Sequence, residues 1–300
     1  MENYNKTFQD YSELADLAIA RGLEVPDKQT LVTVLKNISY YRFSGYLFPF
    51  KRTDSDDFQL NTSLSEVLER YTFDENLREI TFKAFSKIEV QLRNDIIHEH
   101  AKKYGPFGYL GHQQLPNMPR CRHEELVAAL AINKERSKEP FILSYNRKYT
   151  NKGLPLWMAI ETLTFGQLLY VHSGLDRDIH KIIADKYCLP NKVLRSWIVS
   201  SGYIRNICAH HYRLWDRKLS LKPSRREKCP EWMKPFPVET STFYAIALVL
   251  LHFQQNVQSV DWKKNFLNLA QEFPKIPFSD NMGFPPTWRE LPMWTESILE

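Results

Sequence analysis

Apolar residues recur at steps of three and four along most of the chain, the spacing that places them on one face of an α-helix. The clearest case begins after Asp74, an aspartate suited to capping a first helical turn, and its apolar positions repeat as far as Ile96. Gly105 and Pro106 then remove helical propensity and a backbone donor. The sequence therefore predicts a long amphipathic helix over residues 74–104.

The same spacing returns in ten further segments, and three Pro-rich stretches between them are expected to be loops. The expected helices cover residues 12–21, 28–38, 64–71, 123–138, 140–149, 155–173, 176–187, 191–211, 241–258 and 261–272. The expected loops cover residues 115–119, 223–237 and 274–292. Because no set of alternating strands accompanies them, the predicted fold class is all-α. We expect a small N-terminal helical part, residues 1–62, to pack on a larger helical domain, residues 63–300.

Composition changes this picture little. The formal net charge of +5 and the pI of about 8.8 permit a nucleic-acid partner without requiring one. The four cysteines form no CxxC pair, which indicates a reducing compartment. The first ten residues do not resemble a signal peptide, and the apolar run 243–253 is far shorter than the roughly 20 residues of a membrane span. A cytoplasmic protein without a membrane partner is expected.

Neither a metal nor a cofactor is expected from the motifs. Cys121-x-His123 and Cys208-x-His210 lack the close paired spacing of structural zinc sites. The chain also has no phosphate-binding glycine loop, no dinucleotide fingerprint and no nucleophile elbow.

The segment YIRNICAHHYRLWDR, residues 203–217, carries the most informative chemistry. Arg205 and His210 lie five residues apart, so on a helix they point about 140° away from each other. Asn206 lies four residues before His210, on the same face, where it could hydrogen-bond the imidazole. A histidine can move the proton of a ribose 2′-hydroxyl, and an arginine can stabilise the charge of a phosphorane-like transition state. The three residues are candidates for metal-independent RNA cleavage.

A second Arg-Asn-x-x-x-His sequence occurs at Arg93, Asn94 and His98. Chance alone gives roughly half of one Arg-x4-His pair in a chain of this composition, so two pairs that both carry the asparagine are notable. The second copy lies inside the expected helix 74–104. We expect it to form ion pairs with Glu89, Asp95 and Glu99, with an accessory role in the site as the alternative.

Four ordered segments support a family resemblance: ISYYRFSGYLFPF at 38–50, the segment 73–105, LPLWMAIETLTFGQLLY at 154–170 and RNICAHHYRLWDR at 205–217. Together with MGFPPTW at 282–288, they resemble abortive-infection proteins of the AbiD/AbiF group, whose Arg-Asn-x-x-x-His signature belongs to a HEPN domain. The similarity spans most of the chain, and the ordered set is what makes it specific.

The resemblance implies an all-helical, HEPN-like bundle and a role in phage defence or as the toxin of a toxin–antitoxin pair. It implies RNA cleavage at a composite site built from two motifs, with Arg205, Asn206 and His210 as catalytic residues. A homodimer that brings two copies of this motif together is the preferred geometry, and 2′,3′-cyclic phosphate ends are the expected products. An antitoxin, either a small RNA or a protein, is an expected partner. A non-catalytic module that binds RNA or protein is the alternative.

Several residues near the motif are expected to contact RNA. The run 213–228 has seven basic and two acidic residues, with Tyr212 and Trp215 available for stacking, although a solvated loop is an equal interpretation. The expected RNA-binding residues are His211, Tyr212, Arg213, Arg217 and Lys218.

Structural interpretations remain open at each candidate. Arg205 could pair with a carboxylate and His210 could cap a helix C-terminus. Glu161, inside an apolar segment, is expected to be buried against an arginine, with a place in the site as the alternative. Arg42 and Tyr46, in the aromatic stretch 40–50, are expected to pack in the core, although they could face substrate.

Overall fold

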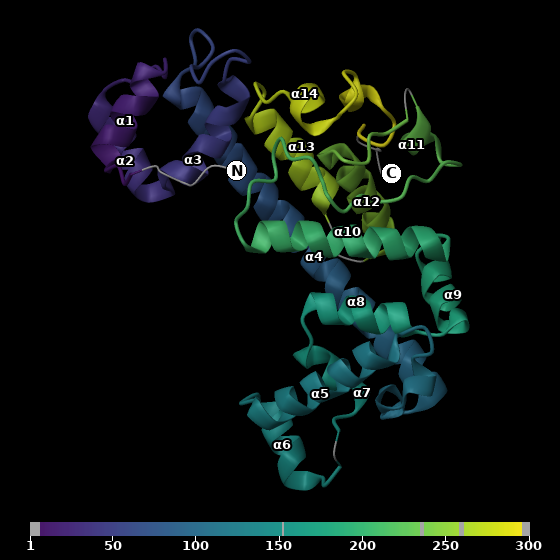
Figure 1. Ribbon diagram of the computed structural model, residues 1–300. Coiled ribbons are helices and arrows are strands. Elements are labelled where there is room, and N and C mark those ends of the chain that lie inside the picture. Colours follow the sequence, from purple (N-terminus) through teal and green to yellow (C-terminus); the bar gives the residue numbers. More distant parts are fainter. Residues whose placement is uncertain (1–6, 152, 235–236, 258–260, 296–300) are drawn as a thin grey trace. The chain divides into compact units, whose positions relative to one another are not determined.

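The computed structural model describes residues 7–151, 153–234, 237–257 and 261–295 (Figure 1). Within these residues every regular element is a helix, and extended pairing is limited to two isolated β-bridges. The all-α fold class is therefore confirmed. The chain forms two compact units, which consist of residues 1–78 with 268–276 and residues 79–267 with 277–300. The expected division into domains at residue 62 stays a prediction.

The first unit is helical from its first described turn. It contains α1 Tyr11–Ala20, α2 Lys28–Ile38, α3 Tyr40–Leu47, the 3₁₀-helix η1 Phe48–Phe50 and the beginning of α4 Leu64–Tyr104. The expected helices 12–21 and 28–38 are confirmed, whereas α3 was not expected. Asp10 and Glu13 start α1 with a capping box, in which each side chain accepts a hydrogen bond from the other's backbone N–H.

The expected helices 64–71 and 74–104 are one continuous helix, α4, of 41 residues. Asp74 was therefore wrongly interpreted as a cap. Its carboxylate is fully buried, accepts a 2.6 Å hydrogen bond from the hydroxyl of Tyr46 and pairs with Arg78 one turn later. Buried charge is tolerated when it is paired in this way. Tyr46, only 1% exposed, is a core residue rather than a substrate contact.

The second unit contains the rest of α4 and most other elements. These are η2 Gly108–Leu110, η3 His112–Gln114, α5 Arg120–Arg136, α6 Pro140–Lys148, α7 Leu156–Ala159, η4 Ile160–Thr162, α8 Phe165–Gly174, α9 Arg177–Lys186, α10 Asn191–Ala209, α11 Pro230–Met233, α12 Phe243–Asn256, α14 Phe278–Met282 and η5 Trp288–Glu290. The helix α13 Trp262–Glu272 contributes residues to both units. Most expected helices are confirmed to within a few residues. Residue 258 of one expected helix and residues 235–236 of one expected loop lie outside the described residues.

The expected helix 155–173 is broken, because the backbone is extended at Leu163. A new helix, α8, starts at Thr164, whose side chain accepts from the N–H of Gln167 while the Gln167 side chain accepts from the N–H of Thr164. This capping box satisfies two N–H groups that a helix start would leave without partners. The carbonyl of Ile160 accepts a 3.1 Å hydrogen bond from the N–H of Leu163, the last bond of η4 before the break.

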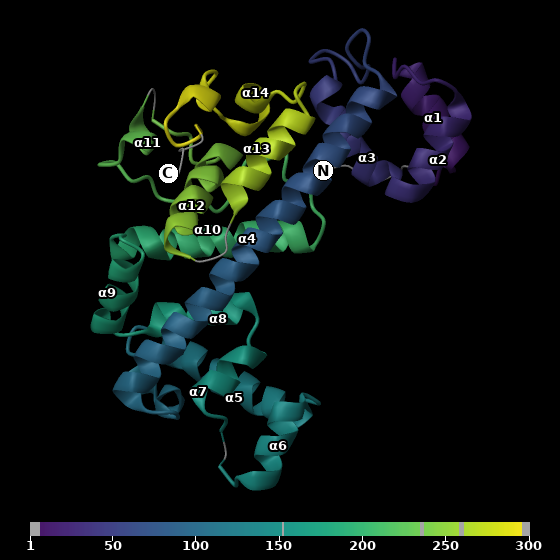
Figure 2. The same cartoon turned by 180° about the vertical axis from the view of Figure 1, so that it is seen from behind.

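The centre of the second unit is α10, which packs against α8, α9 and α12 (Figures 1 and 2). Gly202 allows the close approach of α8, since a Cβ at this position would lie 3.1 Å from Leu169 and 3.3 Å from Phe165. The helix α12 is buried on almost all sides, as its sequence FYAIALVLLHF requires. Among the described residues, no helix is long and apolar enough to cross a membrane.

Buried histidines make the second unit sensitive to acid. Burial, together with the neighbouring His180, lowers the pKa of His172 to about 3. Burial likewise lowers the pKa values of His180 and His100. In the unfolded chain a histidine titrates near pH 6.5, so between that pH and about 3 the unfolded state binds more protons. The stability that these neutral side chains provide is present above pH 6.5 and is lost as the pH falls.

We expect His172→Leu to flatten the acid dependence of unfolding. Between pH 7 and pH 5, a histidine whose pKa falls from 6.5 to about 3 removes about 2 kcal/mol from the free energy of unfolding. Urea titrations at the two pH values measure this difference. The control His98→Leu, at an exposed position, should keep the wild-type dependence. An unchanged dependence in His172→Leu would contradict the assignment.

Candidate active site

The candidate catalytic residues lie on the last turns of α10 and at its end. Arg205 and Asn206 belong to the helix, and His210 is the residue at which it stops. The next residue, His211, adopts a left-handed conformation with φ of 57°. The N–H of His211 bonds to the carbonyl of Cys208 and the N–H of Tyr212 to that of Ile207. These two bonds form a Schellman motif, which ends α10 abruptly.

This helix end leaves His210 exposed. Its backbone N–H is bound by the carbonyl of Asn206, and its ring centroid lies 6.1 Å from that of Tyr212. The imidazole is therefore accessible and attached to a rigid backbone, as a proton-transfer group needs to be.

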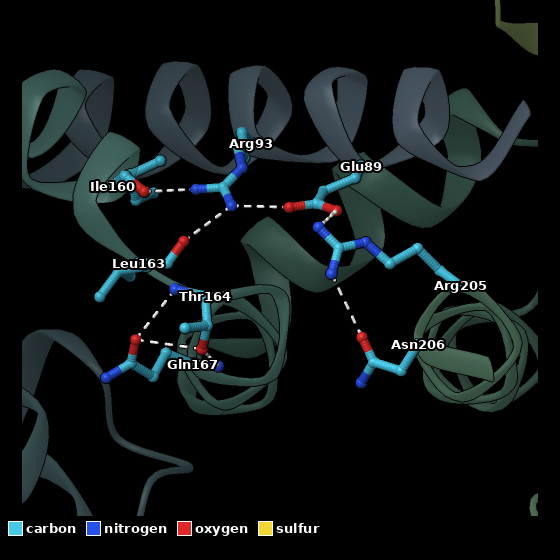
Figure 3. A network of polar contacts seen from close by, with 8 residues as sticks. All are labelled: Glu89, Arg93, Ile160, Leu163, Thr164, Gln167, Arg205 and Asn206. Carbon is cyan, nitrogen blue, oxygen red and sulfur yellow. Dashed lines mark hydrogen bonds and ion pairs between the residues drawn. The ribbon is translucent and has the colours of Figure 1, made fainter. Parts of the chain in front are cut away.

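Arg205 turns away from His210 and toward α4. Its Nη2 lies 3.3 Å from a carboxylate oxygen of Glu89, and its Nη1 donates a 3.2 Å hydrogen bond to Oδ1 of Asn206 (Figure 3). The guanidinium carbon lies 5.7 Å from the ring centroid of Phe82. Its Nε is buried and has no hydrogen-bond partner among the described residues. The head group is thus fixed on one side, while its side chain remains 28% exposed.

Glu89 is shared by two arginines. Its second carboxylate oxygen lies 2.7 Å from Nη2 of Arg93, so that the carboxylate is held between Arg93 and Arg205 (Figure 3). The side chain of Glu89 is only 8% exposed. One carboxylate cannot neutralise two guanidinium groups, and the three side chains keep a net charge of +1. The positive charge that a phosphate needs therefore persists after pairing.

Arg93 has a structural role. Besides Glu89, its guanidinium group donates hydrogen bonds to the carbonyl oxygens of Ile160 and Leu163, the latter at 2.8 Å (Figure 3). Both carbonyls lie at the end of η4, just before α8 begins. The expected ion pair between Arg93 and Glu89 is confirmed, but the side chain of Arg93 is 12% exposed and is not part of a surface network.

The second motif does not bring its arginine and histidine together. His98 is exposed and lines a cavity of about 290 Å³ with Asp95 and Lys186, whereas Arg93 points toward Glu89. His98 lies 3.8 Å from Glu99, as expected. Asp95 does not join them, because its carboxylate pairs with Lys186 and accepts a 2.7 Å hydrogen bond from Tyr187.

Three further expectations need correction. Asn206 binds the guanidinium of Arg205 with its side chain, rather than the imidazole of His210. Glu161 is exposed on η4 and is not the buried partner of an arginine; Glu89 has that position. Trp215 is fully buried, so its ring is not available for base stacking.

The expected RNA-contacting residues surround the end of α10. His211 and Lys218 are exposed, and the ring of Tyr212 is 58% exposed. Arg213 donates a 3.2 Å hydrogen bond to the carbonyl of Asp216, and Arg217 donates one of 2.6 Å to the carbonyl of Arg213. Arg42 belongs to the other compact unit, and its accessory role stays a prediction, as does that of Asn94.

Both features of the structural interpretation are present, since Arg205 pairs with a carboxylate and His210 stands at a helix C-terminus. The functional interpretation is compatible with both features, because the paired arginines keep a net positive charge beside α4 and the imidazole of His210 remains accessible. Glu89 was expected only as a partner of Arg93, four residues later on the same helix, and not as the residue that organises the site. No local signal points to its contact with Arg205.

A family model described as Abi-like protein matches residues 33–216, a span that includes both Arg-Asn-x-x-x-His sequences and Glu89. No curated protein and no solved structure gives a significant match.

We expect Glu89→Gln to lower the free energy of unfolding by about 1–3 kcal/mol, because two partly buried guanidinium groups lose their shared counter-charge. Urea unfolding of this variant, of Arg205→Met and of the double variant forms a cycle that isolates the Glu89–Arg205 coupling. The exposed Glu161→Gln serves as the control and should change stability by less than about 0.5 kcal/mol. Additive effects of the two single substitutions would rule out a direct interaction.

Proposed function

This chain belongs to the family of Abi-like proteins, and on that premise we propose that it is a metal-independent endoribonuclease of HEPN type. Membership in the family suggests a role in abortive infection, the defence of a bacterial population against phage. The observation that carries the nuclease proposal is the arrangement at the end of α10. There a guanidinium group is held by Glu89 and Asn206, and an exposed imidazole stands at the helix terminus.

The proposed reaction is an attack of a ribose 2′-hydroxyl on the adjacent phosphorus. His210 takes the hydroxyl proton, the 2′-oxygen forms a bond to phosphorus, and the bond from phosphorus to the 5′-oxygen breaks. Arg205 stabilises the charge that develops on the non-bridging oxygens, and Asn206 and Glu89 hold its guanidinium group in place. The products are a 2′,3′-cyclic phosphate and a 5′-hydroxyl, and the reaction consumes no water.

The leaving 5′-oxygen needs a proton from a second group. Since one protomer carries one His210, a second copy of the motif would supply it, which supports a homodimeric active form. Exposed apolar side chains on α4 are consistent with such an interface, because Phe82 is 37% exposed and Val90, next in sequence to Glu89, is 65% exposed. Phe82 lies under the guanidinium of Arg205, so an interface here would bring two motifs near each other.

A nuclease with these properties requires restraint in an uninfected cell. We propose an antitoxin partner, either a small RNA or a protein, that covers the end of α10. The alternative function is a non-catalytic module that binds RNA or protein through the same surface.

We expect purified protein to cleave labelled cellular RNA in EDTA, and His210→Ala and Arg205→Ala each to reduce the rate at least about 100-fold. The matched control is His98→Ala, which changes the histidine of the other Arg-Asn-x-x-x-His sequence and should stay within about threefold of wild type. Gel analysis of the products should reveal cyclic phosphate ends. Cleavage that survives in both site variants would refute the mechanism, and RNA binding without cleavage in wild type would favour the alternative.

We expect Val90→Glu to abolish the dimer and the cleavage together, since a charge at an apolar interface is costly to bury. Light scattering coupled to size exclusion should give about twice the chain mass of 35.5 kDa for wild type and the single mass for the variant. The control Ile182→Glu, at an exposed apolar position on α9, should remain dimeric and active. A monomeric wild type that cleaves RNA would disprove the composite site.

A further inference from the structure

The basic segment 213–228 runs back along α10 in the opposite direction. Near the end of α10, the hydroxyl of Tyr203 is hydrogen-bonded by Ser220 and Arg217. Nearer its beginning, Trp197 donates a 2.8 Å hydrogen bond to the carbonyl of Ser224. Ser196 accepts a 2.9 Å hydrogen bond from the N–H of Ser224. In both views α11, which follows the segment, lies toward the beginning of α10 (Figures 1 and 2).

A cavity of about 460 Å³ lies where this segment reaches the start of α10. Its lining includes Lys192 from the first turn of α10, together with Ser224, Arg225, Glu227 and Thr240. A cavity of this size is within the range of small-ligand sites. The lining therefore combines two cations, two hydroxyl groups and one carboxylate.

Several features make this cavity suitable for a phosphate group. Arg225 is held in place, since its Nε donates a 2.6 Å hydrogen bond to the carbonyl of Val238. The first turn of α10, which follows Pro190, has no side-chain cap, and helix N-termini favour negative charge. Hydrogen bonds from Ser241 lower the pKa of Glu239, and the positive charges of Lys222 and Arg225 lower it further, so a carboxylate also lies near these cations.

We propose that this cavity binds a nucleotide of the substrate RNA at a distance from the cleaved bond, and that the segment 213–228 guides the strand between the two places. The proposal rests on the nuclease function proposed above. Because α10 has 19 residues, the cavity and His210 are separated by about 28 Å. At 3.4 Å for each stacked nucleotide, this distance corresponds to about eight nucleotides at most.

The side chains between the two places suit a single strand of RNA. Arg217, Lys218 and Lys222 follow one another along the segment and can pair with successive phosphates. Tyr212 and Leu221 are 58% and 46% exposed, so bases can pack against them. Glu227 is an acceptor only, which suits a ribose hydroxyl rather than a phosphate.

The test is a binding measurement in the full-length His210→Ala background, in which RNA is not cleaved. Fluorescence anisotropy with a labelled 20-residue oligouridine compares this protein with one that also carries Lys192→Gln and Arg225→Gln. We expect the Kd to rise about tenfold at 150 mM salt. The slope of log Kd against log salt should fall by about 1.4, since two phosphate contacts in a single strand are removed.

Two controls separate this site from a general loss of charge. Arg147→Gln with Lys148→Gln removes the same charge from exposed positions on α6 and should leave the Kd and the salt slope unchanged. A four-residue oligouridine can occupy only one of the two places at a time, so its Kd should rise less in the cavity variant than the Kd of the 20-residue oligouridine. Equal losses with both oligonucleotides, or in the control variant, would overturn the proposal.

A final arm distinguishes RNA from a free anion. Inorganic phosphate, titrated by calorimetry, should lose its heat of binding once the 20-residue oligouridine saturates the protein. Phosphate binding that persists in saturated protein would assign the cavity to a separate anion and overturn the RNA assignment. The binding assay does not depend on cleavage, so the two proposals can fail separately. If only the nuclease proposal fails, the wild-type protein binds RNA through the cavity but does not cleave it.

Discussion

The candidate site depends on one carboxylate, that of Glu89, placed between two guanidinium groups. On one side it holds Arg93, which binds the carbonyls where the chain breaks before α8. On the other side it holds Arg205, whose position determines where a phosphate could bind. A buried carboxylate must be paired, and here the pairing links the packing of α8 on α4 to the geometry of α10. Because Glu89, Arg93 and Arg205 together keep a net positive charge, they can still bind an anion.

The end of α10 supplies the second constraint. A Schellman motif usually has glycine in its left-handed position, but here His211 occupies it. Histidine is among the residues that tolerate this conformation, although it does so at some cost in backbone energy. The strained position adjoins the imidazole proposed to transfer protons, and such outliers tend to cluster at functional sites. The burial of Leu214 and Trp215 directly afterwards anchors the chain and keeps the turn in place.

Helical periodicity was sufficient to predict the fold class and most helices, because the apolar face of each helix is visible in its spacing. It failed where tertiary contacts decided the outcome. Asp74 has the composition of a cap, but a buried tyrosine and arginine make it an interior residue of α4. The break before α8 could have been found from the Thr164–Gln167 capping box, a local signal. The role of Glu89 could not, because its link to Arg205 joins residues 116 positions apart, and only folding brings them together.

The contacts of Arg93 bear on which substitutions the chain can accept. Its planar guanidinium group meets three acceptors on two elements at once, and a lysine, with a single nitrogen atom, could not reach them all. Lysine should therefore not be able to replace arginine at position 93, whereas substitutions at the exposed neighbour Asn94 should be tolerated. Residues 93 and 94 repeat the letters of residues 205 and 206, yet selection would act on the two pairs for different reasons. Two copies of one short motif thus meet at a single carboxylate, one through contacts of the fold and the other at the candidate site.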